Sequence, residues 1–213
     1  MNAVNLPNAL TVGRIAATPL IAVLPFANSV GLRLAAFILF TVAAITDFID
    51  GHLARSRKQE TDLGRLLDPL ADKLLLLGTL VPMYLLAAEH PFITPIGTIG
   101  LSAWIVAIVL GREIFMTVFR QAAKRRGVVI AAIGPAKWKT AFQLVWQGSA
   151  YCWFFAATLA AAQGWNNGRW HDFALLNGTV GMLTMVAAVV LTLYSLALYL
   201  RGFGSIFASP TSK

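Results

Sequence analysis

The sequence predicts an all-α integral membrane protein with six transmembrane helices and both termini in the cytoplasm. Of the 213 residues, 58% are apolar and 12% are charged, with a mean hydropathy of +0.71; soluble chains are about half apolar and a quarter charged. Six long stretches carry no charged residue, and the basic residues are very unevenly distributed between the loops. The same composition, with its single cysteine, excludes disordered and disulfide-rich chains.

Each helix is placed by an apolar stretch, since a membrane crossing needs about 20 mostly apolar residues. Stretches without Asp, Glu, Lys or Arg run over 15–32, 34–46, 74–88, 91–111, 140–168 and 173–200. Polar breaks with Gly or Pro lie at 28–31, 89–91 and 164–168. We therefore expect helices over 8–28, 32–56, 63–88, 97–124, 138–164 and 173–201. They form a single domain over 1–213, with an interfacial lead at 1–7 and a cytoplasmic tail at 202–213.

The basic residues set the orientation, because Lys and Arg are enriched in cytoplasmic loops. Only Arg33 and Arg169 lie on the face opposite the termini. The net charge of +8 is then explained by topology and by anionic lipid headgroups, and nucleic acid binding is not needed. The face that holds both termini carries the other 15: Arg14, Arg55, Arg57, Lys58, Arg65, Lys73, Arg112, Arg120, Lys124, Arg125, Arg126, Lys137, Lys139, Arg201 and Lys213.

Six of the nine acidic residues fall between positions 47 and 72. Asp47 and Asp50 are three apart near the end of the second predicted helix, and Asp68 and Asp72 are four apart near the start of the third. Both spacings put the paired side chains on one helical face. A short cytoplasmic turn makes the two helices antiparallel, so the two carboxylate faces can meet at the cytoplasmic side.

Four carboxylates at membrane depth need compensation, because each costs about 2.5–3.5 kcal/mol at the bilayer centre and less near the interface. Salt bridges to Arg55, Arg65 or Lys73 are one possibility. Oxygen ligands without cysteine or a histidine pair instead suit hard cations such as Mg²⁺ or Mn²⁺. Two such ions would neutralise the four aspartates.

Small residues accompany the carboxylates. Gly51 and Ala54 follow Asp47 by four and seven positions, and Gly64 precedes Asp68 by four. One interpretation is close packing between the helices. The other is a slot for a flat ligand beside the metals, with Arg55 at its cytoplasmic edge to hold a phosphate.

These residues together resemble a known signature. The pattern resembles the complete signature of the CDP-alcohol phosphatidyltransferases, and all eight fixed positions and spacings agree. The motif is Asp47-x-x-Asp50-Gly51-x-x-Ala54-Arg55, eight residues, Gly64, three residues, Asp68, three residues and Asp72.

The resemblance implies a six-helix, usually dimeric membrane enzyme in which an acceptor hydroxyl displaces CMP from a CDP-linked lipid. It implies that Asp72 is the general base towards that hydroxyl, and that Arg55 contacts the diphosphate. The implied ligands of two divalent cations, Mg²⁺ or Mn²⁺, are Asp47, Asp50, Asp68 and Asp72. The implied border of the cytidine is Gly51, Ala54 and Gly64.

Further basic residues address the acceptor. Arg112 and Arg120 are eight apart within an otherwise apolar span, and Lys137 and Lys139 begin the fifth predicted helix. Buried arginines need an anionic partner. A phosphate-bearing acceptor would supply it, and Glu113 is a second candidate partner. Topology alone would explain the charges at 124–126.

The segments 5–14, 112–120 and 137–143 resemble the phosphatidylglycerophosphate synthase branch of the family, although Ala136 stands where the branch usually has glycine. This resemblance implies a bacterial inner (plasma) membrane homodimer that uses CDP-diacylglycerol and glycerol 3-phosphate. The acceptor phosphate would be held by Arg112, Arg120, Lys137 and Lys139.

Other functions stay open. The same chemistry could serve another acceptor, either phosphatidylglycerol in cardiolipin synthesis or an inositol phosphate. A divalent-cation transporter is a remote alternative. Its site should lie near mid-membrane with access from both faces, whereas these carboxylates crowd towards one face.

Overall fold

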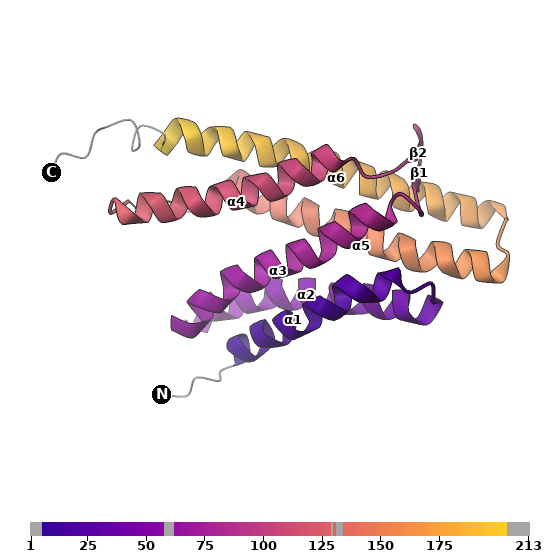
Figure 1. Cartoon of the computed structure of the whole chain (residues 1–213), viewed down its shortest axis with the longest axis horizontal. Coiled ribbons are helices and arrows are strands. Elements are labelled where there is room, and N and C mark those ends of the chain that lie inside the picture. The colour runs from indigo at the N-terminus through magenta and orange to yellow at the C-terminus, as the bar shows by residue number, and fades with distance from the viewer. Residues whose placement is uncertain (1–5, 58–61, 129, 131–133, 204–213) are drawn as a thin grey trace. The chain divides into compact units, whose positions relative to one another are not determined.

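The computed structural model describes residues 6–57, 62–128, 130 and 134–203, without the side chains of 6–7, 48–57, 62–63 and 65–66. Six α-helices dominate this part of the chain, as predicted (Figure 1). The elements are α1 Leu6–Val23, the 3₁₀ helix η1 Leu24–Phe26, α2 Val30–Arg57, α3 Asp62–Leu86, β1 Phe92–Thr94, β2 Gly97–Ile99, α4 Ala103–Arg125, α5 Gly134–Gln163 and α6 Gly168–Phe203.

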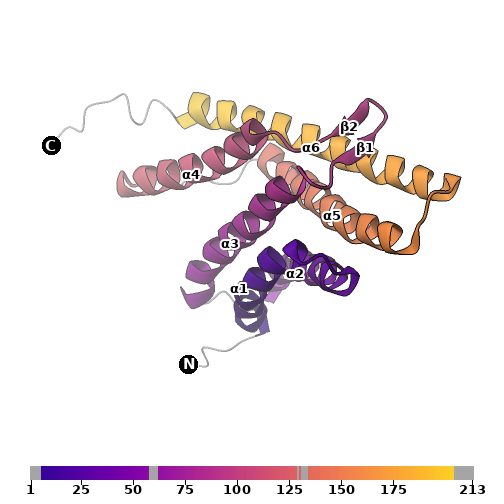
Figure 2. The same ribbon diagram turned by 45° about the vertical axis from the view of Figure 1, so that its right-hand side comes forward.

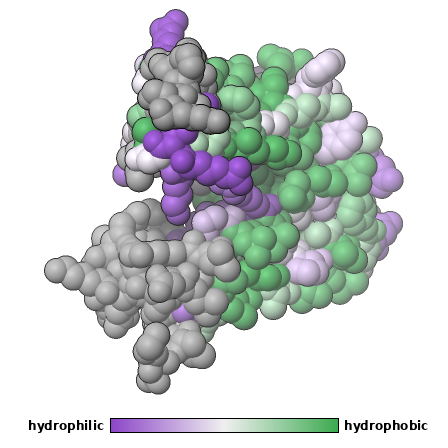
Figure 3. Space-filling view, turned by 60° about the vertical axis from the view of Figure 1, so that its left-hand side comes forward, coloured by the Kyte–Doolittle hydropathy of each residue, from purple (hydrophilic) through white to green (hydrophobic). Residues whose placement is uncertain are grey.

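The apolar helices identify a multi-pass membrane protein. Four segments are long and apolar enough to cross a bilayer: Asn8–Phe26, Val30–Asp47, Leu67–Leu86 and Gly168–Phe203. Large apolar side chains are exposed along them, such as Leu176, Leu183 and Val190, seven residues apart on α6, and hydrophobic residues cover large areas of the face in Figure 3. A lipid environment accounts for this exposure. α4 and α5 have 23 and 30 residues, and their membrane crossing stays a prediction.

The segment before α4 differs from the prediction. The sequence predicts a helix from residue 97, but a hairpin of β1 and β2 lies there and α4 begins at Ala103 (Figure 2). Thr94 pairs with Gly97, and Thr94 Oγ1 donates to the Gly97 carbonyl at 2.6 Å. Gly97 has a φ of +115°, which favours glycine. The turn chemistry overrides the apolar run that suggested a helix.

The chain forms two compact units, and unit 1 contains the four aspartates of the predicted metal site. Unit 1 comprises Met1–Leu101 and Gln147–Gly181, where α1 packs against α2 and α3 (Figures 1 and 2). The approach of α1 to α3 is close at Gly78, because a Cβ there would lie 2.6 Å from Thr18 Cγ2. Tyr151 of α5 donates to the carbonyls of Ile21 and Gly78 at 3.2 and 3.3 Å. These contacts fix α1 against α3.

Unit 2 comprises Ser102–Trp146 and Met182–Lys213. Its described helices are α4, the first part of α5 and the last part of α6. Met116, Phe119 and Ala123 of α4 form a buried core with Ile130 and Tyr199. This core supports the basic residues of α4.

Gly178 gives a test of the fold within unit 1. A Cβ at this position of α6 would overlap the backbone carbonyl oxygen of Ile93. We expect Gly178→Ala to destabilise the protein by about 1–3 kcal/mol, as overpacking does, with a lower midpoint of thermal unfolding in detergent. Gly31→Ala is the control, because a Cβ there meets nothing within 4 Å. Equal midpoints for the two variants would contradict the hairpin placement.

Candidate active site

Three helices of unit 1 bring signature carboxylates together. Arg14 of α1 donates through Nη1 to Oδ1 of Asp47 on α2, and the same nitrogen lies 3.4 Å from Oδ1 of Asp72 on α3. Thr11 Oγ1, one turn before Arg14, donates to Asp68 Oδ1 at 2.9 Å. One face of α1 therefore contacts carboxylates from both neighbouring helices.

The exposure of these groups leaves the carboxylates accessible. The Arg14 side chain is 2% exposed, whereas those of Asp47 and Asp72 are 37% and 60% exposed. Arg14 offsets part of the repulsion between the two carboxylates, because opposite charges in contact stabilise each other more strongly away from water. Asp47 and Asp72 are therefore bound to the buried Arg14 on one side, and the rest of each carboxylate is accessible to a ligand.

The donor chemistry fits the predicted cations. Asp47, Asp68 and Asp72 offer only oxygen ligands, which suit Mg²⁺ or Mn²⁺. Within the described residues, no three metal-ligating side chains form a ready cluster. The side chain of the fourth predicted ligand, Asp50, lies outside that description, so the ligand set stays a prediction.

The predicted cytidine slot is described only in part. Gly64 is buried in α3, one turn before Asp68. Gly51, Ala54 and Arg55 continue α2 as a helix, but what surrounds their side chains lies outside the described residues. The roles predicted for these four residues therefore stay predictions.

Sequence reasoning missed the contribution of α1. The charge pattern assigns Arg14 to topology alone, yet its side chain is buried against Asp47 and Asp72. The signal was available, since Arg14 is the only charged residue of α1. A lone arginine in an apolar helix needs an anionic partner, the same argument that singled out Arg112.

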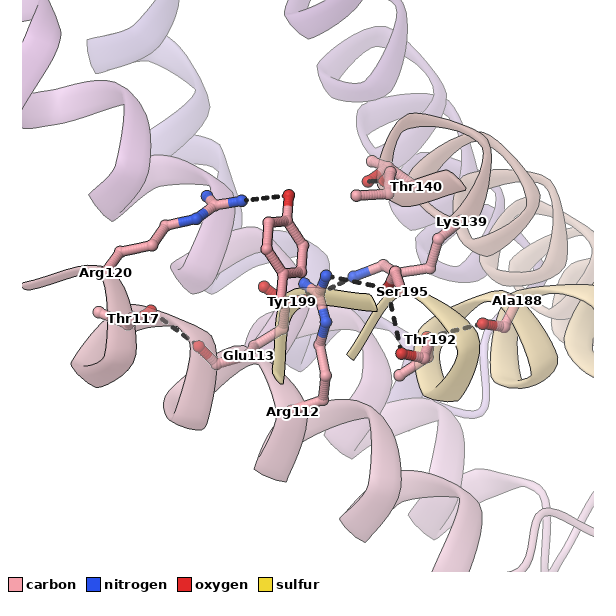
Figure 4. Close-up of polar contacts among 11 residues, drawn as sticks. Arg112, Glu113, Thr117, Arg120, Lys139, Thr140, Ala188, Thr192, Ser195 and Tyr199 are labelled. Carbon is pink, nitrogen blue, oxygen red and sulfur yellow. Dashed lines mark hydrogen bonds and ion pairs between the residues drawn. The ribbon is translucent and has the colours of Figure 1, made fainter. Parts of the chain in front are cut away.

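A basic cluster lies in unit 2 (Figure 4). Arg112 Nη1 of α4 donates to Glu113 Oε1 at 2.9 Å, and Lys139 Nζ of α5 donates to the same oxygen. Arg112 Nη2 also donates to Ser195 Oγ of α6 at 3.2 Å. Arg112 and Lys139 are 7% and 4% exposed. Two buried cations therefore share one carboxylate.

The other two predicted acceptor residues are placed differently. Arg120 is exposed, donates to the Tyr199 hydroxyl at 3.1 Å, and stacks over its ring at 5.4 Å from the centroid. Lys137 is exposed, whereas Lys139 is buried, because residues two apart lie on different faces of a helix. The structure joins Arg112 and Lys139 through Glu113, places Arg120 beside Tyr199, and leaves Lys137 on another face of α5.

The comparisons with known proteins identify the family of this chain. The family model described as CDP-alcohol phosphatidyltransferase matches residues 4–194. The chain belongs to that family. It is a membrane transferase of phospholipid synthesis, and membership favours the enzyme over the transporter alternative.

Three relatives of this transferase cover most of the chain. It is 33% identical over 204 residues to CDP-diacylglycerol–glycerol-3-phosphate 3-phosphatidyltransferase 1 of Arabidopsis thaliana, covering 92% of this chain and 62% of that protein. It is 32% identical to the CDP-diacylglycerol–glycerol-3-phosphate 3-phosphatidyltransferase of Escherichia coli (strain K12), and the match covers 92% of this chain and 93% of that protein. It is also 32% identical to a CMP-forming cardiolipin synthase of Oryza sativa subsp. japonica, and the match covers 92% of this chain and 56% of that protein.

Proposed function

We propose that this transferase moves the phosphatidyl group of CDP-diacylglycerol to sn-glycerol 3-phosphate, releasing CMP and forming phosphatidylglycerol phosphate. The observation that carries the choice of acceptor is the positive charge of unit 2. Arg112, Lys139 and Arg120 supply three cations against the single carboxylate of Glu113, which leaves two. A phosphomonoester carries about −1.5 to −2 at neutral pH, which matches this excess.

The carboxylates of unit 1 supply the other half of the proposed reaction. Asp47, Asp50, Asp68 and Asp72 would hold two Mg²⁺ or Mn²⁺ ions, which when bound polarise the attacked phosphoryl group and neutralise the leaving phosphate. Of the two carboxylates that contact Arg14, that of Asp72 is the more exposed. In this proposal Asp72 takes the proton of the acceptor hydroxyl. Arg14 keeps Asp47 and Asp72 oriented. Arg55 and the small residues Gly51, Ala54 and Gly64 receive the CDP group.

The proposal includes the setting of the enzyme. We place it in the plasma membrane of a bacterium as a homodimer of single-domain chains, each with six transmembrane helices and cytoplasmic termini. The match to the Escherichia coli enzyme supports a bacterial origin. The family match over 4–194 runs through both units, which supports a single domain.

The second candidate is a cardiolipin synthase, favoured by the rice relative at 32% identity. Its acceptor, phosphatidylglycerol, is a phosphodiester with one negative charge, which leaves one cation of unit 2 uncompensated. Purified protein in lipid nanodiscs separates the candidates when CMP release from CDP-diacylglycerol is measured with each acceptor in turn. Glycerol 3-phosphate should support release, and phosphatidylglycerol or an inositol phosphate should not. Release with phosphatidylglycerol alone would assign the second candidate.

Removal of divalent ions tests the proposed cation site. We expect EDTA to abolish CMP release and Mg²⁺ or Mn²⁺ in excess of the chelator to restore it, because the uncompensated carboxylates would repel the CDP diphosphate. CMP release is measured before and after chelation, and EDTA premixed with excess Mg²⁺ is the control. Full activity of protein stripped of metal would contradict the cation requirement.

A further inference from the structure

The buried face of α5 continues beyond Lys139 with a polar residue. Gln143 follows Lys139 by four positions, and the two side chains lie on one face of the helix, where such neighbours have Cβ atoms about 5–6 Å apart. Gln143 is 6% exposed and Lys139 is 4% exposed. A buried amide is costly unless its oxygen and nitrogen are hydrogen-bonded.

Two polar atoms near this point have no partner within the described residues. They are Oε1 of Gln143, a hydrogen-bond acceptor, and Nε of Arg112, a donor. Arg112 and Lys139 meet at Glu113 Oε1, as Figure 4 shows, and Gln143 lies one turn along α5 from Lys139. Arg112 therefore has an unsatisfied donor, and the residue one turn from Lys139 has an unsatisfied acceptor.

Gln147, one further turn along α5, does not supply the missing donor for Gln143 Oε1. It is 1% exposed, and its Nε2 also has no partner in the described part of the chain. Gln147 Nε2 therefore does not donate to Gln143 Oε1. A ligand can satisfy Gln143 only if it carries a hydroxyl or amine donor, and it satisfies Arg112 only if it carries an acceptor.

Glycerol 3-phosphate carries both kinds of group, an acceptor and a donor. Its phosphate oxygens can accept hydrogen bonds from Arg112 and Lys139. Its C2 hydroxyl, on the carbon next to the phosphorylated one, can donate to Oε1 of Gln143, the residue one helical turn after Lys139. The C1 hydroxyl is then free to react. An acceptor without a C2 hydroxyl would leave Gln143 Oε1 unpaired.

We propose that Gln143 is a specificity-determining residue that accepts a hydrogen bond from the C2 hydroxyl of the glycerol phosphate acceptor. This inference rests on the function proposed above and adds a second recognition point beside the phosphate. It predicts that the enzyme distinguishes glycerol 3-phosphate from 1,3-propanediol monophosphate, which has the same phosphate and a primary hydroxyl but no C2 hydroxyl.

The experiment compares kcat/KM for these two acceptors in purified protein, followed by CMP release. The wild-type protein should prefer glycerol 3-phosphate by about tenfold, the worth of a buried hydrogen bond at the upper end of the usual range. In Gln143→Leu this preference should fall to about twofold or less, with the KM for CDP-diacylglycerol unchanged. Gln143→Met, which keeps the length of the side chain, should give the same ratio and serves if the leucine variant does not fold.

Gln147→Leu is the matched control, since it removes a second buried amide from the same face of α5. It should keep the wild-type preference between the two acceptors. A preference that persists in both Gln143 variants, or that disappears equally in Gln147→Leu, overturns the role of Gln143. A wild-type protein that does not use glycerol 3-phosphate at all defeats the proposed function itself, so the two failures are distinguishable.

Discussion

Asp72→Asn should reduce the turnover number by about a thousandfold or more, because it removes both a proposed metal ligand and the proposed general base, and a general base alone contributes about 10²–10⁴. Asparagine has nearly the same shape as aspartate. The Asp72 side chain is 60% exposed, so we expect the fold to survive. The measurement is CMP release under saturating concentrations of both substrates, beside thermal unfolding of the same preparation.

Asp172→Asn is the control for Asp72→Asn. Asp172 is an exposed aspartate near the start of α6, and its loss should leave turnover unchanged. Near-normal turnover of a folded Asp72→Asn protein would remove Asp72 from the proposed mechanism and with it the proposed proton acceptor.

Arg112→Ala should raise the KM for glycerol 3-phosphate by about 30-fold or more, since truncating one partner of a buried charge pair costs about 2–5 kcal/mol. Arg112 is 7% exposed and contacts Glu113 and Ser195 through its two terminal nitrogens. The KM for CDP-diacylglycerol should change much less, because its proposed site uses the residues of α2 and α3. Initial rates with each substrate varied in turn measure the two constants.

Arg125→Ala is the control for this substitution, because Arg125 is exposed at the end of α4. It should leave both KM values near those of the unmodified protein. An Arg112→Ala protein in which the two KM values rise equally would argue that Arg112 supports the fold and does not bind the acceptor phosphate.

The sequence was most informative where spacing alone defines a helical face. The intervals between Asp47 and Asp50 and between Asp68 and Asp72 predicted two carboxylate faces, and the structure brings Asp47 and Asp72 to one nitrogen of Arg14. The six helices were predicted for the same reason, since apolar length and polar breaks are local properties. The arginine at position 112, within a largely apolar span, likewise predicted an anionic partner, and Glu113 provides one.

Contacts between distant segments could not be predicted in this way. The pairing of Arg14 with residues 33 and 58 positions away depends on how α1 packs against α2 and α3. Ser195 and Tyr199 join the basic cluster from α6, which carries no motif that the sequence analysis could use. The hairpin at 92–99 depends on the turn around Gly97, whose conformation a hydropathy pattern does not reveal.

The central claim is tested most directly by following both products of one reaction in proteoliposomes that contain CDP-diacylglycerol. Labelled sn-glycerol 3-phosphate is added, and released CMP is compared with label that enters the lipid phase. The account predicts that CMP release requires the acceptor and that one molecule of labelled phosphatidylglycerol phosphate forms for each CMP. CMP released without incorporation of the label, or no release with both substrates present, would contradict it.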